Sequence, residues 1–364
     1  MDKKELLLFV NRKAREKKLY IVGAGNYGRI FGKWLEKNNV LWYGYIDKYK
    51  EGYLEGRPIN KYDDVNASDV YLISSYTHTS DIFKMLKDQG ADENNIIRIS
   101  RQAVVYEVLD ELELGNPNNE DISGFYNKYK GKRCFLVGNG PSLRTDDLDK
   151  IKNEYSFGCN SIYGIYSQTS WRPTYYVYTD PIIVEVFDDN KELYEELLNS
   201  SIVFSSTIAR TEMIIQRDSM KHYFFKSLDA SREGRVRFSE KCHEAVYTQG
   251  TVMYVMLQLA VYMGFSEVYL IGVDFNYSIE RDYKGNIKEN NVINHNVFIE
   301  EEEKVFQEIV QKKYGYKYLA DIDMQLEAYK TANRYAALHG YSIYNSTRGG
   351  KLEVFKRVCF DSLF

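Results

Sequence analysis

Two short apolar segments of the chain each run directly into a glycine-rich turn. The first segment, 19–22, enters GAGNYG at 23–28, and the second, 133–137, enters GNGPSL at 138–143. A buried strand that leads into a glycine turn and a helix opens the βαβ unit of a parallel sheet. The sequence therefore predicts an α/β fold with two Rossmann-like domains. We expect the C-terminal domain to be a mainly parallel sheet with helices on both faces and a mobile lid segment at about 276–320.

The length of the chain also favours two domains, because 364 residues exceed one average domain. A cluster of turn residues, GNPNN at 115–119, separates two runs of alternating strand and helix patterns. We expect a small Rossmann-like domain at 1–105, a helical linker at 106–130 and a larger domain at 131–364.

Polar and glycine residues collect where the predicted strands of the larger domain end. The carboxyl ends of parallel strands form the crevice in which open α/β sheets bind ligands. Six such residues, spread over 137 sequence positions, should therefore share one rim: Gly138, Gly140, Asn160, Asp180, Ser205 and Asp274.

The turn at 23–28 has the GxGxxG form of a dinucleotide-binding loop. Gly23, Gly25 and Gly28 follow a strand and open a helix. Asp47 lies 19 residues beyond the last glycine, where an acidic residue would hold a ribose hydroxyl. Glycine turns also serve only to pack a helix on a strand, so a nucleotide or nucleotide-sugar site and a structural or regulatory role both stay open. This half resembles the small Rossmann-like domains of sugar-modifying acyltransferases and other surface-polysaccharide enzymes.

The turn at 138–143 indicates a phosphate or ribose site. Gly138 and Gly140 allow the backbone to approach a ligand closely. Pro141 suits the first turn of a helix, and the amides that follow, together with Ser142, would face the ligand at a helix N-terminus. The turn is not a Walker loop, because no GK[ST] follows. A plain tight turn is the alternative.

Several motifs resemble those of one group of glycosyltransferases. In order, they are FLVGNGPSL, FGCNSIYG, YTDP, TQGTVMY, YLIGVDF and IYNSTRGGKLEVF, and they span about 131–358. They are similar to motifs of the bacterial lipooligosaccharide sialyltransferases and, more closely, of the motility-associated-factor (Maf) glycosyltransferases. The archaeal 6-hydroxymethylpterin pyrophosphokinases share the GNGPSL type of turn. The resemblance implies metal-independent transfer of a sugar, a nonulosonic acid such as a sialic acid, from a CMP-activated donor to a surface glycan, glycolipid or protein.

The resemblance also implies which residues bind the donor. The CMP part would contact the glycine turn and the asparagine that closes the next strand. Asp180 would face the sugar or ribose, where the sialyltransferases carry asparagine, and the loop before the long helix would complete the site. The donor-binding set is then Gly138, Asn139, Gly140, Ser142, Asn160, Asp180, Gln249, Gly250, Thr251 and Asp274.

Three further residues would carry the chemistry. In the sialyltransferases two tyrosines six residues apart support the leaving phosphate, and Tyr277 and Tyr283 have this spacing. A neutral phenol can donate a hydrogen bond to a phosphate oxygen that gains charge, without a metal. His295 is the histidine in the segment that supplies the general base, and its usual pKa suits that role. A surface-loop histidine is the alternative.

Two motifs allow other interpretations. Asp321-Ile322-Asp323 has the form of a metal-binding DxD, but it opens a predicted helix, where capping favours acidic residues. Arg348-Gly349-Gly350-Lys351 could bring positive charge to an anionic ligand or be an exposed turn. We expect no metal and no required cofactor.

Two rival functions stay open. A pterin pyrophosphokinase would need ATP and Mg²⁺ and would give Asp180 or Asp274 a metal role. A non-catalytic nucleotide-sugar binding protein would use the turn at 23–28 as its main site.

Composition narrows the class of partner. The net charge of −4 gives no reason to expect nucleic acid. The four cysteines are scattered without metal-ligand spacing, and no apolar run is long enough for a signal peptide or membrane span. We expect a cytoplasmic homo-oligomer, with possible peripheral contact at the inner face of the membrane.

Overall fold

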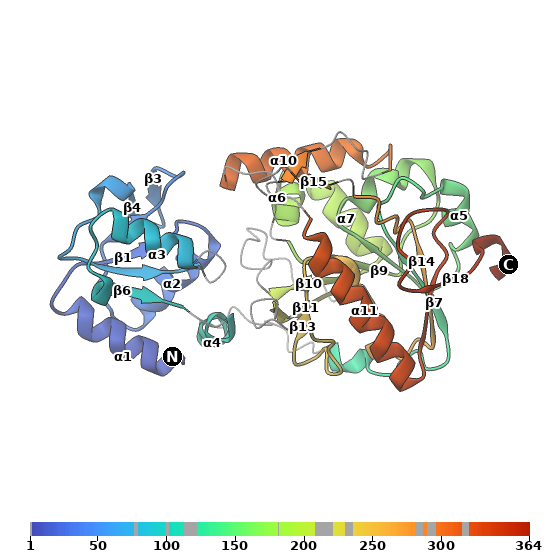
Figure 1. Cartoon of the computed structure of the whole chain (residues 1–364), viewed down its shortest axis with the longest axis horizontal. Coiled ribbons are helices and arrows are strands. Elements are labelled where there is room, and N and C mark those ends of the chain that lie inside the picture. Colours follow the sequence, from blue (N-terminus) through green and yellow to red (C-terminus); the bar gives the residue numbers. More distant parts are fainter. Residues whose placement is uncertain are drawn as a thin grey trace. The chain divides into compact units, whose positions relative to one another are not determined.

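The structure is a computed structural model in which the chain forms two compact units, Met1–Asn119 and Glu120–Phe364 (Figure 1). Each unit has its own sheet and is described separately. The described residues are 2–75, 79–99, 102–112, 122–180, 182–207, 221–229, 236–277, 279–281, 287–289, 296–314 and 320–364.

The first unit contains a six-stranded sheet in the order β3-β4-β2-β1-β5-β6. Every pairing is parallel except that of β3 with β4. The strands are β1 (Leu19–Val22), β2 (Gly44–Ile46), β3 (Gly52–Leu54), β4 (Arg57–Asn60), β5 (Val70–Ile73) and β6 (Ile96–Arg98). The helices are α1 (Lys3–Ala14), α2 (Asn26–Lys37), α3 (Thr79–Asp88) and α4 (Gln102–Glu111).

The second unit is built on an eight-stranded parallel sheet in the order β11-β10-β9-β8-β7-β14-β17-β18. Its strands are β7 (Arg133–Val137), β8 (Ser156–Cys159), β9 (Tyr175–Tyr178), β10 (Ile202–Ser206), β11 (His222–Phe225), β14 (Glu267–Ile271), β17 (Ser342–Asn345) and β18 (Lys356–Arg357). Two short pairs stand apart, β12 (Ser227–Leu228) with β13 (Val246–Tyr247) and β15 (Ile279–Arg281) with β16 (Ile287–Glu289). The predicted fold class, two Rossmann-like α/β units with mainly parallel sheets, is confirmed.

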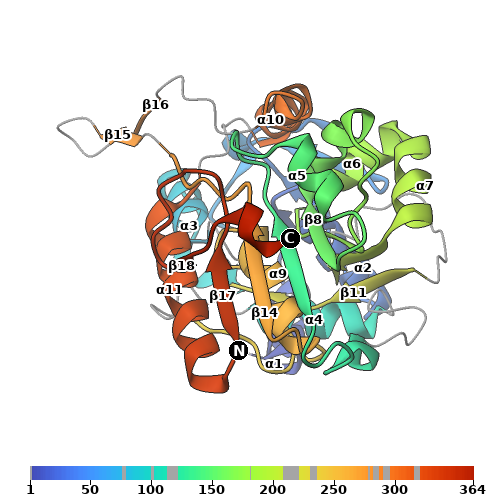
Figure 2. The ribbon, with the colours of Figure 1, turned by 90° about the vertical axis from the view of Figure 1, so that its right-hand side faces the viewer.

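Helices cover both faces of the larger sheet. They are α5 (Thr145–Lys150), α6 (Ile182–Asp189), α7 (Lys191–Ser200), α9 (Val252–Tyr262), α10 (Glu300–Tyr314) and α11 (Ile322–His339). Neighbouring side chains of a strand point to opposite faces, so Leu136 packs with α9 and α11, whereas Val137 packs with α5, α6, α7 and α10. Figure 2 shows α11 on one side of the strands and α6 and α7 on the other.

The strand order of the second unit reverses between β7 and β14. From β7 the chain proceeds through β8, β9 and β10 to β11 on one side, and it then returns to β14 and β17 on the other side. The loops after β7 and β14 diverge at this point and leave a crevice, which is where open α/β sheets bind their ligands.

Side-chain caps fix where the two long central helices begin. Thr251 accepts a hydrogen bond from the Met253 amide at 3.2 Å and caps α9. Asp321 accepts one from the Met324 amide at 3.0 Å and caps α11, so the capping interpretation of the DxD motif is confirmed for Asp321. Gly340 ends α11 in the left-handed conformation, with φ of 77°.

Candidate functional site

The ends of β7 and β14 meet backbone to backbone. The amide of Gly138 donates to the Ile271 carbonyl at 2.9 Å, and that of Gly140 donates to the Gly272 carbonyl at 2.8 Å. A Cβ on Gly138 would stand 2.5 Å from the Gly272 oxygen, and a Cβ on Gly272 would stand 2.6 Å from the Gly138 oxygen. Only glycine fits at this contact, which explains the glycines in both FLVGNGPSL and YLIGVDF.

Asp274 holds the glycine turn in place. Its Oδ2 accepts hydrogen bonds from the Ser142 hydroxyl at 2.8 Å and from the Ser142 amide at 3.2 Å. A Cβ on Gly140 would lie 2.0 Å from the same oxygen. The buried carboxylate therefore shapes the turn, and Ser142 contacts Asp274.

The RGGK segment after β17 contacts the backbone of Asp274. The Lys351 amide donates to the Asp274 carbonyl at 2.7 Å, and a Cβ on Gly350 would stand 2.6 Å from that carbonyl oxygen. The Arg348 guanidinium pairs with Asp147 at 2.7 Å and with Asp361 at 2.8 Å. The positive charge of Arg348 is therefore used in ion pairs that join the RGGK segment to α5 and to the C-terminal segment.

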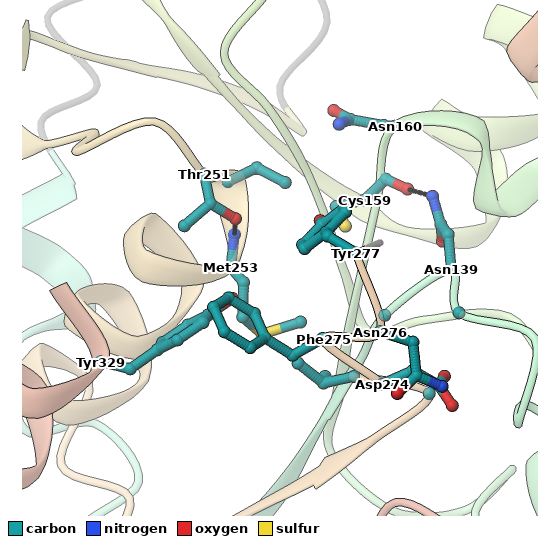
Figure 3. Close-up of a pocket in the computed structure, with 15 residues that line it drawn as sticks. Asn139, Cys159, Asn160, Thr251, Met253, Asp274, Phe275, Asn276, Tyr277 and Tyr329 are labelled. Carbon is teal, nitrogen blue, oxygen red and sulfur yellow. Dashed lines mark hydrogen bonds between the residues drawn. The ribbon is translucent and has the colours of Figure 1, made fainter. Parts of the chain in front are cut away.

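A cavity of about 150 Å³ lies at the reversal point between β7 and β14 (Figure 3). Residues from the β7, β8 and β14 loops, the start of α9 and the α11 helix line it. They are Gly138, Asn139, Gly140, Cys159, Asn160, Thr251, Val252, Met253, Gly272, Val273, Asp274, Phe275, Asn276, Tyr277 and Tyr329.

The N-terminus of α9 forms one wall of the cavity. Thr251, Val252 and Met253 all line it, and Figure 3 shows the capping hydrogen bond between Thr251 and Met253. The first amides of a helix lack intrahelical acceptors, and the helix dipole places partial positive charge there. This wall suits a phosphate or another anion.

Two asparagine side chains give the cavity unpaired acceptors. The Asn139 Nδ2 donates to the Cys159 carbonyl at 3.2 Å. The Oδ1 atoms of Asn139 and Asn160 are buried, and neither has a hydrogen-bond partner among the described residues. A buried polar atom without a partner is unfavourable, and an amide oxygen requires a donor. These oxygens suit hydroxyl or amino groups of a ligand.

Three aromatic rings in contact form another part of the lining. The Phe275 ring makes edge contacts with Tyr277 at 5.6 Å and with Tyr329 at 5.9 Å, between centroids. Figure 3 shows the Phe275 and Tyr329 rings side by side. Burial raises the pKa of Tyr329, the nearby Tyr277 raises it further, and a hydrogen bond with Thr251 lowers it. The Tyr329 phenol therefore stays neutral at physiological pH.

The structure brings most of the expected donor-binding residues to this cavity. Those that line it are Gly138, Asn139, Gly140, Asn160, Thr251, Asp274 and the expected catalytic Tyr277. Ser142 reaches the site through Asp274. Tyr283 and His295 lie outside the described residues.

Three expected residues are placed elsewhere. Asp180 accepts from the Ile182 amide at 2.9 Å, at the start of α6, and is not among the lining residues. Gln249 is fully buried in the loop before α9. The Gly250 carbonyl accepts from Gln325 at 3.1 Å. The Gly250 hydrogen bond joins the loop before α9 to α11, and both side-chain polar atoms of Gln249 are buried without a hydrogen-bond partner among the described residues.

Tyr329 is a lining residue that the sequence did not reveal. It lies on α11, on a buried face with the small residues Ala328 and Ala332. A tyrosine within an alanine-lined helix face is a weak signal for a site, since the same pattern describes an ordinary core helix.

The residue that follows His295 in the sequence is fixed at the glycine turn. The Asn296 amide donates to the Asn139 carbonyl at 2.8 Å, and its Nδ2 donates to the Leu143 carbonyl at 2.7 Å. Asn296 is buried. The start of the segment that leads into α10 therefore lies beside the cavity.

The glycine loop of the first unit is held by its own acidic residue. Asp47 accepts from the Ala24 amide at 2.7 Å and from the Tyr49 and Lys50 amides at 2.9 and 3.0 Å. A Cβ on Gly28 would stand 1.9 Å from the Gly23 carbonyl oxygen, whereas a Cβ on Gly25 would meet no atom of the described residues within 4 Å. The loop is thus closed by the contact of Gly28 with Gly23 and by the hydrogen bonds of Asp47. The space beside Gly25 is not filled by other described residues.

No three His, Cys, Asp or Glu side chains are grouped to hold a metal ion in the described part of the chain. Within the same ranges, no helix has both the length and the apolar character needed to cross a membrane.

A protein-family model covers all the residues that line the cavity except Tyr329. The model described as 6-hydroxymethylpterin diphosphokinase MptE-like matches residues 106–280. No curated protein matches the chain.

The solved structures that are similar to this chain include two enzymes. One is the Maf glycosyltransferase from Magnetospirillum magneticum AMB-1, with 14% identity, a TM-score of 0.40 and coverage of 100% of this chain and 62% of that one. This chain thus spans less than two thirds of that protein. The other is the sialyltransferase CstII from Campylobacter jejuni in complex with the substrate analogue CMP-3FNeuAc, with 15% identity, a TM-score of 0.35 and coverage of 62% of this chain and 86% of that one. Both belong to the groups whose motifs the sequence resembles.

Proposed function

We propose that the second unit is a glycosyltransferase that takes a nonulosonic acid, such as a sialic acid, from a CMP-activated donor. The observation that carries this proposal is the cavity at the strand reversal, where a helix N-terminus faces two buried, unpaired asparagine oxygens. A nucleoside monophosphate presents both matching groups, an anionic phosphate and donors on the ribose and base.

The donor would place its phosphate at the start of α9. Thr251 and the first amides of α9 would bind the phosphate oxygens, while Asn139 and Asn160 would accept hydrogen bonds from the nucleoside. The glycine turn would let the backbone approach the ligand closely. Asp274 would act by holding this turn through Ser142.

The reaction would be a direct displacement at the anomeric carbon. The acceptor oxygen forms a bond to this carbon, the bond from the carbon to the phosphate oxygen breaks, and CMP leaves. His295 would take the proton of the acceptor hydroxyl. Tyr277 and Tyr283 would donate hydrogen bonds to the leaving phosphate. Because these hydrogen bonds stabilise its developing charge, the reaction would need no metal. The anchored Asn296 lies next to His295 in the chain, which supports this choice of base.

The acceptor would be a surface glycan, a glycolipid or a protein. A turnover assay tests the reaction. The purified chain, given a CMP-linked sialic acid, EDTA and candidate acceptors, should release CMP and label one acceptor. His295→Ala should lower turnover on the order of 100-fold or more if it is the base, with unchanged melting temperature. Near-normal turnover of this variant would exclude His295 as the base.

A diphosphokinase is the second candidate, favoured by the family model over 106–280. It would transfer diphosphate from ATP to a pterin alcohol with Mg²⁺, and Asp274 or Asp180 would bind the ion. Against this, Asp274 already accepts two hydrogen bonds from Ser142, and Asp180 caps the start of α6. Formation of AMP from ATP, dependent on Mg²⁺ and a pterin alcohol, would favour this candidate over the first.

A further inference from the structure

The first 18 residues carry a charge opposite to that of the rest of the chain. They contain seven Lys and Arg against three Asp and Glu, a net charge of +4, whereas the whole chain has −4. The remaining 346 residues therefore carry −8. Helix α1 (Lys3–Ala14) occupies most of this basic segment (Figure 1).

Helix α1 has a buried face and a distinct exposed face. Leu6 and Val10 are buried, and the helix packs on α4 and β5. On the inner side, Lys3 pairs with Glu111 at 2.6 Å and Lys13 donates to Asn95 at 3.2 Å. These two lysines are thus used within the first unit.

The exposed face combines an apolar side chain with three basic ones, and the exposed Glu5 and Glu16 border it on one side. Leu8 is 73% exposed, and at 100° per residue it lies opposite the midpoint of Leu6 and Val10. Lys4 lies four residues before Leu8, and Arg12 and Arg15 lie four and seven residues after it. All three basic side chains are exposed. These spacings place them on the same face. Within the described part of the chain, no carboxylate pairs with any of the three.

Two further exposed apolar residues, Leu41 and Tyr43, lie in the first unit, and Tyr43 contacts the last residue of the basic segment. Lys18 lies over the Tyr43 ring, with Nζ 5.5 Å from the centroid. Tyr43 is 39% exposed and Leu41 is 60% exposed. Lys18, the last residue of the basic segment, therefore lies against a partly exposed aromatic ring.

We propose that this basic face, formed by Lys4, Leu8, Arg12 and Arg15, binds an anionic phospholipid surface. Basic side chains are attracted to the negative headgroups, and Leu8 enters the boundary between headgroups and acyl chains. Nucleic acid would engage the charges but offers no apolar layer for Leu8. The proposal is independent of the function proposed for the second unit.

Vesicle flotation of the full chain tests the proposal. The chain should float with vesicles of equal parts phosphatidylglycerol and phosphatidylcholine but not with pure phosphatidylcholine, and raised salt should release it. The triple variant Lys4→Gln, Arg12→Gln, Arg15→Gln should bind on the order of 100-fold more weakly, since each basic residue contributes about fivefold. Leu8→Gln should weaken binding while the salt dependence persists.

Two controls separate the basic face from general charge and folding effects. The triple variant Lys48→Gln, Lys84→Gln, Lys87→Gln removes the same charge from other exposed sites of the first unit and should bind like the wild type. Lys4→Arg, Arg12→Lys, Arg15→Lys keeps the charge and should also bind. Three results would overturn the proposal. They are an equal loss of vesicle binding in the two triple variants that carry Gln, no binding of the wild type to anionic vesicles, and tighter binding to a DNA duplex than to vesicles.

Discussion

Gly140 and Asp274 lie 134 positions apart in the sequence, yet a Cβ on Gly140 would stand 2.0 Å from the Asp274 Oδ2. Glycine at 138, 140 and 272 allows two strand ends to touch and leaves the cavity beside them. At the scale of single residues, the glycine turn could be recognised from the sequence. Its contact with Asp274 and Gly350 could not, because it depends on strands that meet only in the folded sheet.

Replacement of Gly140 tests this contact. We expect Gly140→Ala to displace Asp274, to destabilise the second unit by about 1–3 kcal/mol as overpacking does, and to weaken CMP binding. Thermal melts with and without CMP measure both effects. Gly124→Ala is the matched control, since no described atom outside its chain neighbours lies within 4 Å of its Cβ position. Equal behaviour of the two variants would contradict the close contact.

The phenol of Tyr277 is expected to act in the transition state. Tyr277→Phe should lower kcat about 100-fold by removing one donor to the leaving phosphate, with little change in KM and with the ring contact to Phe275 preserved. Steady-state kinetics with a CMP-linked sugar measure this. A raised KM with normal kcat would instead assign Tyr277 to ground-state binding.

At the scale of elements, the N-terminal cap of α9 has two roles and that of α11 has one. Thr251 caps α9 and lines the cavity, whereas Asp321 caps α11 away from the lining. Thr251→Ala and Asp321→Ala should each cost about 1 kcal/mol of stability. Only Thr251→Ala should also weaken CMP binding, as calorimetric titration would show. Equal affinities in the two variants would argue against a ligand at α9.

The two strands that lead into the glycine turns were predicted well, and the hairpin of β3 and β4 was missed. Strands β1 and β7 match the predicted ranges 19–22 and 133–137 because buried parallel strands are short continuous apolar runs. β3 and β4 are largely exposed, and Pro58 within β4 weakens its strand pattern. Tyr329 stayed hidden because its helix pattern matches an ordinary core helix.

At the scale of the whole molecule, ion pairs fix the C-terminal segment of the second unit. Arg348 first and Lys150 second, by hydrogen bonds, hold the pKa of Asp361 well below its usual range. A lowered folded pKa means that the stabilisation is present above the unfolded pKa of about 4 and is lost as pH falls through the folded value.

Acid melts test this contribution. Between about pH 5 and pH 2, the melting temperature of the wild type should fall more than that of Asp361→Asn, which lacks the titrating group. Asp146→Asn, which removes an exposed carboxylate of α5, should behave like the wild type. An equal acid-induced loss in Asp361→Asn and the wild type would show that the ion pairs do not affect stability.

On the proposed function, the cavity between β7 and β14 binds the CMP part of a sugar donor without a metal. Thermal stabilisation by CMP, CDP, UDP, GDP, ATP and NAD, each with and without EDTA, tests it most directly. We predict that CMP raises the melting temperature, that EDTA leaves the shift unchanged, and that Asn139→Ala with Asn160→Ala abolishes it. A shift only with ATP and Mg²⁺, or a CMP shift that persists in the double variant, would contradict the claim.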